Sequence, residues 1–364
     1  MRPLKKGLKR GFERLKCGQG LHAGRTVFII SLTQRKCGAL MRDTCLRIVD
    51  LLGNGEYVSG AVLGDKLGVS RTAIWKHLNK LLSWGVPIEK VKGRGYCIRG
   101  GMELLEADLI QKGMTAQASS LMASLQVLAT TRSTNEVVRD HIEQGATKGV
   151  VCFAERQTGG RGRHGREWSS PFGRNLYMSL SWGYDGGAAA LEGLSLTVGV
   201  VVAQVIRSFG VNDVALKWPN DILLERKKVA GVLLEMMGDP VGSCQVIVGI
   251  GINLGMDKDV DVGQPWADLS ESSEAGRNEL ASALLSALLP VLDDYSGSGF
   301  AAYRAHWEEL DAFRNSPIKL ITPRLVVRGI GRGVTDTGAI QIEAGGVVES
   351  YSGGEISLRG DDDS

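Results

Sequence analysis

The sequence predicts an α+β fold in three successive parts that follow a basic extension. Its 364 residues are too many for one ordinary hydrophobic core, because domains usually hold roughly 100 to 200 residues. The apolar residues change from helical spacing near the start to the alternation of short strands near the end. The charge also changes sign along the chain. We therefore expect boundaries that divide the chain into residues 1–40, 41–102, 103–314 and 315–364.

The charge is divided between a basic front and an acidic body. Residues 1–40 hold ten Lys/Arg and one acidic residue, residues 41–100 hold ten and five, and the remaining 264 residues hold 23 and 34. A polyanionic partner is therefore expected for the front only, although chance drift in charge would give the same counts. The cysteines and histidines form no CxxC, HExxH or zinc-finger spacing, so we expect reduced thiols and no structural metal.

The first forty residues do not have the pattern of a secretory signal. Their apolar stretch, residues 26–32, is short, and no small-residue cleavage site follows it. A transit peptide or a basic arm remains open. Because periodic sequence begins just after Met41, we hypothesise that Met41 is the physiological start. The longest apolar runs, such as residues 198–202, are far shorter than the ~20 residues that span a bilayer, which predicts a soluble, cytoplasmic protein without a membrane partner.

Two helices open the module that begins after the extension. Apolar residues recur at helical spacing over residues 45–52 and end at a glycine. Ser59 should then cap a short helix over residues 60–67, and Gly68 should supply the tight turn that follows it.

A third helix is expected over residues 71–84, with its apolar side chains turned inward. The inward set is Ile74, His77, Leu78, Leu81 and Leu82. The outward set, which would meet the DNA major groove, is Arg71, Thr72, Trp75, Lys76 and Asn79.

The stretch 86–98 alternates apolar and basic residues around the sequence Lys92-Gly-Arg-Gly95. This pattern predicts a two-stranded wing whose tip contacts phosphate, so the module is predicted to be a winged helix-turn-helix. The alternative is a small protein-interaction domain with a solvated basic helix. The residues assigned to DNA are Ser70, Arg71, Thr72, Trp75, Lys76, Lys92 and Arg94.

The central part should open with a connection, residues 102–111, and a helix. Ser133 stands three residues before Glu136, which is the spacing of a capping box, so a helix is expected from there to Gly145. A strand over residues 149–154 should then lead into a loop that is rich in glycine and arginine.

This loop, Gly160-Arg-Gly-Arg-His-Gly165, has the glycine spacing of a dinucleotide fingerprint without its context. The fingerprint needs a helix that starts at the glycines and an acidic residue about 20 residues further on. Pro171 and Gly173 forbid that helix, and no acidic residue lies between Glu167 and Asp185. A water-exposed glycine loop with three arginines suggests instead an anion that orders it. The alternative is a solvated basic loop.

Strands and helices that support this loop are expected in the rest of the chain. Residues 214–217 predict a strand that ends in a rigid turn, and residues 246–251 predict a buried strand that ends in small residues, where a ligand can approach closely. Two core helices are expected over residues 191–209 and 280–292. Residues 317–359 alternate as short strands with two glycine turns, which fits a small SH3-like β-barrel.

Five motifs in order resemble those of the bifunctional biotin ligase/biotin operon repressors, and the resemblance covers about residues 42 to 359. It implies a winged helix-turn-helix, a central class II synthetase-like α/β ligase domain and an SH3-like C-terminal barrel. The family usually has Arg where this chain has His164, which leaves the part of that residue in the loop open. The motifs are Gly160-Arg-Gly-Arg-His-Gly165, Lys217-Trp-Pro-Asn-Asp221, Lys228-Val-Ala-Gly231, Gly249-Ile-Gly-Ile-Asn253 and Gly353-Gly-Glu-Ile-Ser-Leu-Arg359.

The implied chemistry joins the carboxylate of biotin to the α-phosphate of ATP, so fixed cations and Mg²⁺ must offset the repulsion between two anions. The resemblance assigns catalysis to Arg163, Lys228 and Asp221. On spacing alone Lys228 could be a solvent-facing lysine and Asp221 a turn-forming residue. The residues implied to bind biotin are Ser133, Thr134, Asn135, Gln157, Arg161, Gly162, Arg163 and Lys228.

The residues implied to bind ATP come from several parts of the chain, and Trp168 among them would stack on adenine while Trp218 is a candidate core residue. The set is Arg166, Trp168, Asn175, Asn253, Glu355 and Arg359. The arginine loop and residues 256–266 should close over the biotinyl-5'-AMP that forms. The implied partners are a biotin carboxyl carrier domain, operator DNA and a second copy of the chain, which pairs when the adenylate is bound.

Other functions remain open at the level of the sequence. The main alternative is a ligase that has lost repression. A transcription factor with an inactive enzyme fold would not need Lys228, Asp221 and the arginine loop together. A lipoate ligase would lack the winged helix, and a dinucleotide oxidoreductase would retain NAD.

Overall fold

The computed structural model describes residues 36–256, 260, 262–273, 275–321, 326–352 and 357–360, with the backbone alone at 36–43 and 357–360. Residues 1–35 of the predicted extension lie outside these ranges, as do Cys17 and the side chain of Cys37. The described cysteines, Cys45, Cys97, Cys152 and Cys244, are free thiols.

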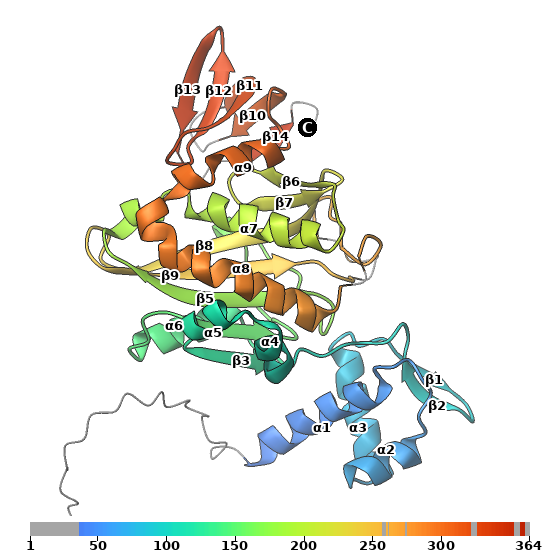
Figure 1. The fold of residues 1–364 in the computed structure, drawn as a ribbon. Helices are drawn as coiled ribbons and strands as arrows, with labels where there is room; N and C mark the ends of the chain where they lie inside the picture. Colours follow the sequence, from blue (N-terminus) through green and yellow to red (C-terminus); the bar gives the residue numbers. More distant parts are fainter. Residues whose placement is uncertain are drawn as a thin grey trace, which may run out of the picture. The chain divides into compact units, whose positions relative to one another are not determined.

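The first module contains three helices and a hairpin, drawn in blue in Figure 1. The elements are α1 (Lys36–Leu52), α2 (Gly60–Leu67), α3 (Arg71–Ser83), β1 (Ile88–Val91) and β2 (Gly95–Ile98). Ser59 caps α2 through its side chain, as expected, and Ser70 caps α3 in the same way. Gly68 takes the left-handed conformation with φ of 68°. Strands β1 and β2 pair antiparallel around the predicted wing tip.

The predicted inward face of α3 is correct except at one position. Ile74, Leu78 and Leu81 are buried in the core of this module, whereas Leu82 is 48% exposed. Leu82 lies next to the buried Leu81, one residue further around the helix, so the apolar stripe is narrower than the sequence suggested. The same core also contains Phe172, from the segment that follows the arginine loop, which stacks on Trp84 with ring centroids 5.3 Å apart.

The predicted connection, residues 102–111, is more ordered than a linker. Helix α4 (Ala107–Gly113) begins inside it, and α5 (Ala116–Leu121) follows. The backbone N–H of Leu105 donates to Glu155 Oε1, and Glu155 in turn forms a buried ion pair of 2.7 Å with Arg277. This connection is therefore attached to the central domain by buried polar contacts.

The centre of the molecule is a seven-stranded sheet in the order β3-β4-β5-β9-β8-β7-β6. Strands β3 and β4 are parallel, and every other neighbouring pair is antiparallel. The strands are β3 (Ser124–Leu128), β4 (Val150–Ala154), β5 (Leu176–Tyr184), β6 (Val214–Lys217), β7 (Asp221–Leu224), β8 (Lys227–Gly238) and β9 (Cys244–Ile252).

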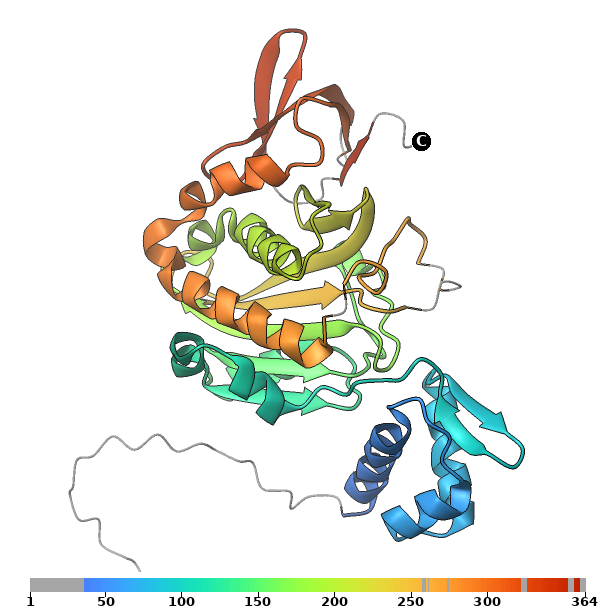
Figure 2. The same cartoon turned by 45° about the vertical axis from the view of Figure 1, so that its right-hand side comes forward.

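The two faces of this sheet are covered differently. Helices α7 (Leu194–Ser208) and α8 (Arg277–Ser298) lie together on one face, as Figures 1 and 2 show, and bury the main core. On the other face α6 (Thr134–Glu143) packs through Val138 against β4 and β9. Because successive side chains of a strand point to opposite faces, the strands present a second set of side chains to the face beside α6.

The segment Gly187–Ser208 is the one stretch in the described ranges that is long and apolar enough to cross a membrane. The short apolar runs of the sequence did not predict this. However, 61% of its most apolar window is buried, and α7 packs against α8 and the central strands. The segment is thus a core element of the fold and only weak support for a membrane span.

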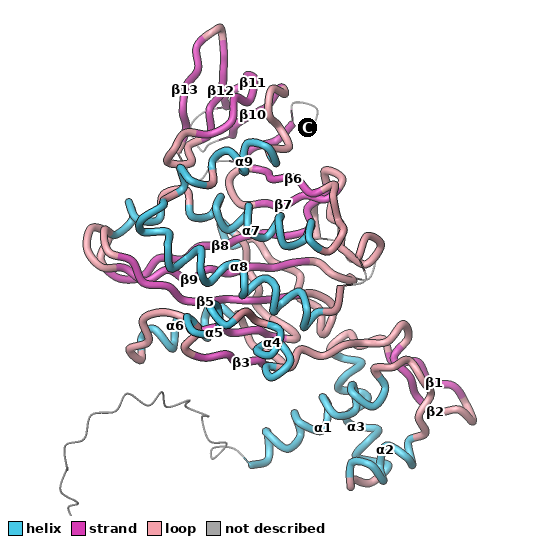
Figure 3. Tube along the Cα trace, viewed as in Figure 1, coloured by secondary structure: helices cyan, strands magenta, loops and turns pink. Residues whose placement is uncertain are grey.

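The C-terminal part is a five-stranded antiparallel sheet in the order β13-β12-β11-β10-β14, shown in magenta at the top of Figure 3. Helix α9 (Arg304–Leu310) precedes it. The predicted turns at residues 336–338 and 345–346 separate its middle strands. The strands are β10 (Pro317–Ile321), β11 (Val326–Val334), β12 (Ile340–Ala344), β13 (Val347–Tyr351) and β14 (Ser357–Gly360).

Candidate functional site

Glycines of β8 and β9 form a flat floor on the sheet face beside α6. Gly251 pairs with Gly231 on the neighbouring strand, and Gly249 lies two residues before it on the same face. A Cβ added at Gly251 would lie 2.5 Å from the Trp168 ring, and one added at Gly249 would overlap the amide of Asn135. The absence of side chains therefore lets Trp168 and Asn135 lie directly on the strands.

Lys228 and Asp221 form the charged centre of this site. Lys228 Nζ lies 2.5 Å from Asp221 Oδ1, and both side chains are largely buried. The same ammonium group lies 5.4 Å from the centroid of Trp168, within the range of a cation–π contact. Lys228 is thus not the solvent-facing lysine that its spacing alone allowed.

Arg163 lies close to the same carboxylate. Burial lowers the pKa of its guanidinium, and the nearby charge of Asp221 raises it. Asp221 is therefore paired with Lys228, and its charge also acts on Arg163. Two positive groups directed at one place can offset the charge of an anionic substrate.

Arg161 has a different environment, which corrects the expectation that the whole loop is exposed to water. Its side chain is 27% exposed and pairs with Glu136 at 2.8 Å and with Glu235 at 3.4 Å. The hydrogen bond that Arg161 donates to Glu136, opposed by desolvation, raises the pKa of Arg161. The loop is therefore not uniformly water-exposed, and only residues 164–167 of this stretch are exposed.

The predicted capping box at Ser133 is wrong. Ser133 occupies the N-cap position of α6, yet its side chain makes no capping hydrogen bond. Glu136, which should complete the box, binds Arg161 instead. The backbone N–H of Thr134 donates to the side chain of Gln157, at 2.9 Å. Gln157, which follows strand β4, thus accepts a hydrogen bond at the start of α6, where the side chain of Ser133 was expected to accept one.

The side chains assigned to biotin converge at this helix terminus. Ser133, Thr134 and Asn135 are all buried, and Gln157 spans from Thr134 to Ser170, to which its amide donates at 3.1 Å. Gly162 begins the short 3-10 turn Arg163–Gly165 as its N-cap residue. The structure brings these residues together with Lys228 around the glycine floor, through Asn135 at Gly249 and Lys228 at Gly231.

The residues assigned to ATP are less uniform. Trp168 contacts the floor, and its buried indole Nε1 has no hydrogen-bond partner among the described residues. Asn175 and Asn253 are buried and contact each other, and Asn175 accepts a bond from the N–H of Leu254. Their visible role is to brace the strand ends, so their contact with ATP stays a prediction.

Three further ATP assignments stay predictions as well. Arg166 lies on the exposed tip of the arginine loop. Glu355 and the side chain of Arg359 lie outside the described residues.

The segment after β9 returns to Lys228. The backbone N–H of Lys228 donates to Pro265 O at 3.2 Å, and Ala267 N–H donates back to Lys228 O at 3.0 Å. Trp266 forms an isolated bridge with Lys228 and holds Val260 O through its indole N–H. The expected covering segment therefore has an attachment point beside the charged centre.

The surface assigned to DNA is exposed as expected. Arg71, Thr72 and Lys76 lie on the open face of α3 with Trp75, which is 56% exposed. Ser70 uses its hydroxyl to cap that helix. The wing residues Lys92 and Arg94 are exposed too, and Arg94 stacks on the Tyr57 ring at 4.1 Å.

Two residues of the site were not predicted from the sequence. Ser179 on β5 is fully buried and contacts both Thr134 and Asn135. Glu235 on β8 accepts hydrogen bonds from Asn135 and Arg139. The two serines Ser179 and Ser181, within the otherwise mostly apolar strand Leu176–Tyr184, were the signal that could have drawn attention to this position.

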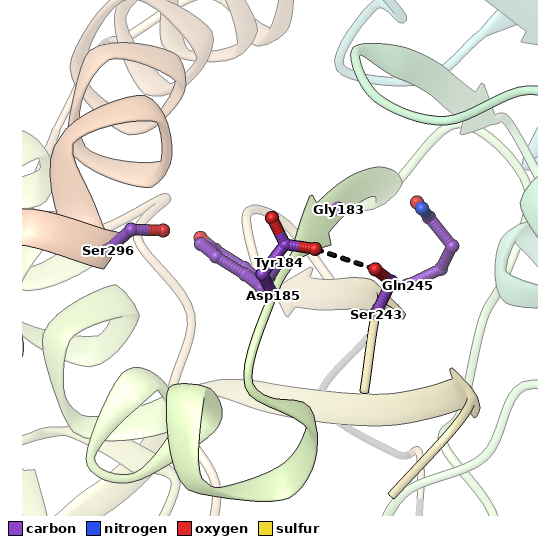
Figure 4. Close-up of a pocket in the computed structure, with 6 residues that line it drawn as sticks. All are labelled: Gly183, Tyr184, Asp185, Ser243, Gln245 and Ser296. Carbon is purple, nitrogen blue, oxygen red and sulfur yellow. Dashed lines mark hydrogen bonds between the residues drawn. The ribbon is translucent and has the colours of Figure 1, made fainter. Parts of the chain in front are cut away.

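A hollow of about 370 Å³ lies elsewhere, at the far ends of β5 and β9. Tyr184, Ser243 and Ser296 are among its lining residues, and Figure 4 shows the hydrogen bond that Ser243 donates to Asp185, another lining residue. Because the glycine floor lies at the other ends of these strands, this hollow is not part of the site described above.

The described residues contain no group of three His, Cys, Asp or Glu side chains that could hold a metal ion. Mg²⁺ commonly binds through one or two carboxylates and the phosphates of a nucleotide. Asp221 is a suitable single carboxylate, so the donor set fits an ion that arrives with ATP.

Three family models match successive parts of the chain. They are the HTH domain over residues 45–97, the biotin/lipoate A/B protein ligase family over residues 127–253 and the biotin protein ligase C terminal domain over residues 314–359. Together with the observed elements they confirm the predicted fold class.

Relatives cover nearly the whole chain. It is 42% identical over 317 residues to the bifunctional ligase/repressor BirA of Escherichia coli K12, which covers 86% of this chain and 97% of that protein. Identity is 41% with the Salmonella typhimurium protein of the same name, over 88% and 99%. A biotin protein ligase from Aquifex aeolicus, solved with biotin and ATP, matches 65% of this chain and 98% of its own at 28% identity and a TM-score of 0.56. The chain therefore belongs to the family of bifunctional biotin ligase/repressors.

Proposed function

We propose that this chain activates biotin with ATP to biotinyl-5'-AMP and transfers the biotinyl group to a lysine of a biotin carboxyl carrier domain. The observation that supports the proposal is the ion pair of Lys228 with Asp221, whose charge also acts on Arg163, beside Trp168 on the glycine floor. Two cations on one surface can bring a carboxylate and a phosphate together, which is the difficulty of this reaction.

In the first step a carboxylate oxygen of biotin attacks the α-phosphorus of ATP, and pyrophosphate leaves with the electrons of the broken bond. Lys228 and Arg163 hold the two anions and stabilise the charge of the transition state. Asp221 keeps Lys228 in place before the substrates arrive, through the 2.5 Å ion pair. Mg²⁺, when bound with the nucleotide, would add positive charge at the phosphates.

In the second step the amine of the acceptor lysine attacks the carbonyl carbon of the adenylate, and AMP leaves. The amine must lose a proton, and Asp221 is the carboxylate of the charged centre that can take it. The arginine loop and the segment around Pro265, which is bonded to Lys228, would exclude water from the mixed anhydride.

The decisive experiment replaces the central lysine and a matched neighbour. Purified protein is incubated with ATP, Mg²⁺, biotin and a carrier domain, and adenylate and biotinylated carrier are measured. We expect Lys228→Ala to lower the rate roughly 10² to 10³-fold. Lys227→Ala, which removes an exposed lysine one residue earlier, should leave it unchanged. Absence of adenylate with the unaltered protein would exclude the proposal.

We propose further that the winged helix represses transcription of biotin genes when biotin is abundant. The exposed groups on α3 and the wing support DNA binding, and the repressor names of the relatives from E. coli and S. typhimurium agree. Adenylate would favour a dimer whose two winged helices read two half-sites. Sedimentation should then show dimers only when biotin and ATP are added. A ligase without repression would give adenylate but no footprint on biotin-gene DNA.

In this proposal the functional parts follow the boundaries expected from the sequence. DNA binding resides in residues 41–102, ligation in residues 103–314 and a supporting role in residues 315–364, with a site of action in the cytoplasm. Residues 1–40 are proposed to precede the physiological start at Met41, although α1 begins at Lys36. The N-terminal mass of the protein from cells would decide this point.

A further inference from the structure

Glu235 fixes the orientation of the Asn135 amide. Asn135 Nδ2 donates to Glu235 Oε2 at 3.0 Å, and the same carboxylate binds Arg139 at 2.9 Å. A carboxylate paired with arginine can only accept hydrogen bonds. A flipped amide would place its oxygen against this carboxylate, so the NH₂ group must face Glu235. Asn135 Oδ1 consequently faces Ser179.

Ser179 has a single hydroxyl proton and two oxygen neighbours. Its Oγ lies 2.5 Å from Asn135 Oδ1 and 2.6 Å from Thr134 Oγ1. Oxygens this close require a proton between them, since O–H···O bonds usually measure about 2.7 to 2.8 Å. The amide oxygen of Asn135 cannot donate, so Ser179 donates to it. The short contact with Thr134 must then be a bond that Thr134 donates to Ser179.

The hydroxyl proton of Thr134 is therefore used in the hydrogen bond to Ser179. Gln157 Oε1 lies 3.2 Å from Thr134 Oγ1, which is long for a hydroxyl bond, and it already accepts the backbone N–H of Thr134 at 2.9 Å. It therefore does not need the hydroxyl proton. With that proton directed at Ser179, Thr134 Oγ1 presents only lone pairs to a substrate.

We propose that Ser179 is a positioning residue that makes Thr134 an obligate hydrogen-bond acceptor, so that the site selects a substrate with an N–H group at this point. The inference rests on the proposed function, in which Thr134 contacts biotin, whose head group is a cyclic urea with two N–H donors. In an analogue with oxygen in place of the N–H that faces Thr134, the ring oxygen and Thr134 Oγ1 would both be acceptors, and no hydrogen bond could form between them. Sites built for a donor reject such analogues strongly.

The test measures binding by calorimetry for biotin and for the two cyclic carbamates in which one or the other ring N–H is replaced by oxygen. With the unaltered protein, one carbamate should bind at least about 100-fold more weakly than biotin. In Ser179→Ala the freed Thr134 hydroxyl can donate. Biotin should then bind about tenfold more weakly, and the discrimination should fall to about tenfold or less.

Ser181→Ala is the matched control. Ser181 is also fully buried, lies two residues along on the same face of β5, and accepts a bond from Val150 N–H instead of touching Thr134 or Asn135. Its replacement should leave the discrimination unchanged. Glu235→Gln gives a second route, because an amide can donate or accept and no longer orients Asn135. Its discrimination should fall as well, even if Ser179→Ala does not fold.

The outcomes separate the two proposals. If the unaltered protein binds biotin and both carbamates alike, the role of Ser179 is excluded while the ligase proposal stands. If Ser179→Ala weakens all three ligands by one common factor, Ser179 is merely structural. If the unaltered protein binds no biotin, both proposals are lost.

Discussion

The two basic regions of this chain hold their charges in opposite ways. At the glycine floor, Lys228 and Arg161 are paired with carboxylates at 2.5 and 2.8 Å. On the winged helix, Arg71, Lys76 and Lys92 are exposed, and none of them forms an ion pair within the described ranges.

The difference matches the size of the expected ligand. A cation that must act on one small anion benefits from a fixed position, which a neighbouring carboxylate supplies. A cation that meets a phosphate backbone needs only to be accessible and unpaired, because binding is driven by the release of counterions. The same kind of residue is thus held rigidly in one region and left free in the other.

Salt should affect the two regions to very different degrees. A proposed dimer presents eight basic groups from α3 and the wing, two copies of Arg71, Lys76, Lys92 and Arg94. If all of them contact phosphate, the affinity for a random duplex should fall on the order of 10⁴-fold between 50 and 200 mM salt. Adenylate formation should change less than about threefold, because buried pairs are screened weakly. Equal salt sensitivity of the two measurements would contradict the comparison.

Gly251→Ala tests whether the floor must be flat. The added Cβ would lie 2.5 Å from the Trp168 ring, so the indole must move away from the sheet. Displacement of about 1 Å in an active site can lower the rate about 10²-fold, and we expect that loss in adenylate formation while DNA affinity is unchanged. Gly199→Ala is the control, since its Cβ would meet Leu216 at an ordinary 3.6 Å. Normal activity of Gly251→Ala would show that Trp168 is not needed at this place.

Asp311 offers a third arrangement, a partly buried residue whose carboxyl forms no ion pair in the described part of the chain. Burial raises its pKa from 3.8 to about 6, despite a hydrogen bond from the N–H of Phe313. The folded state therefore binds the proton more tightly than the unfolded state does. The stability that this proton provides is fully present below pH 3.8 and is lost as the pH rises through about 6.

Asp311→Asn should accordingly be more stable than the parent at pH 7 but not at pH 4. The upper limit of the gain is about 3 kcal/mol, the equivalent of a shift of about two pKa units. Urea unfolding at both pH values measures the free energy difference. A difference that is the same at both pH values would show that Asp311 titrates normally.

Local signals in the sequence were sufficient for most of the fold. The cap at Ser59 and the wing depend on neighbours within a few residues, so spacing predicted them. Leu82 was misplaced because periodicity alone does not show how wide the buried stripe of α3 is. The connection at residues 102–111 was misread because its order comes from Glu155 and Arg277, which are far away in the sequence.

The sequence named many of the residues that gather at the glycine floor, but not the hydrogen bonds and ion pairs between them. Motif resemblance grouped Lys228, Asp221 and Arg163, and the structure pairs Lys228 with Asp221, whose charge also acts on Arg163. The partners of Arg161 could not be predicted, since Glu235 lies on a strand far along the chain. Ser179 is a contact across the sheet with no sequence motif of its own.

Trp218 links the C-terminal sheet to the turn that precedes Asp221. Its buried indole donates to Gly338 O at 2.9 Å, and three residues later the same turn delivers Asp221. A chain shortened before residue 315 would keep every side chain assigned to biotin, yet the indole N–H would lose its hydrogen-bond acceptor. The turn after Trp218 would then no longer be fixed by this hydrogen bond. We expect the shortened enzyme to hold Asp221, the partner of Lys228, less precisely.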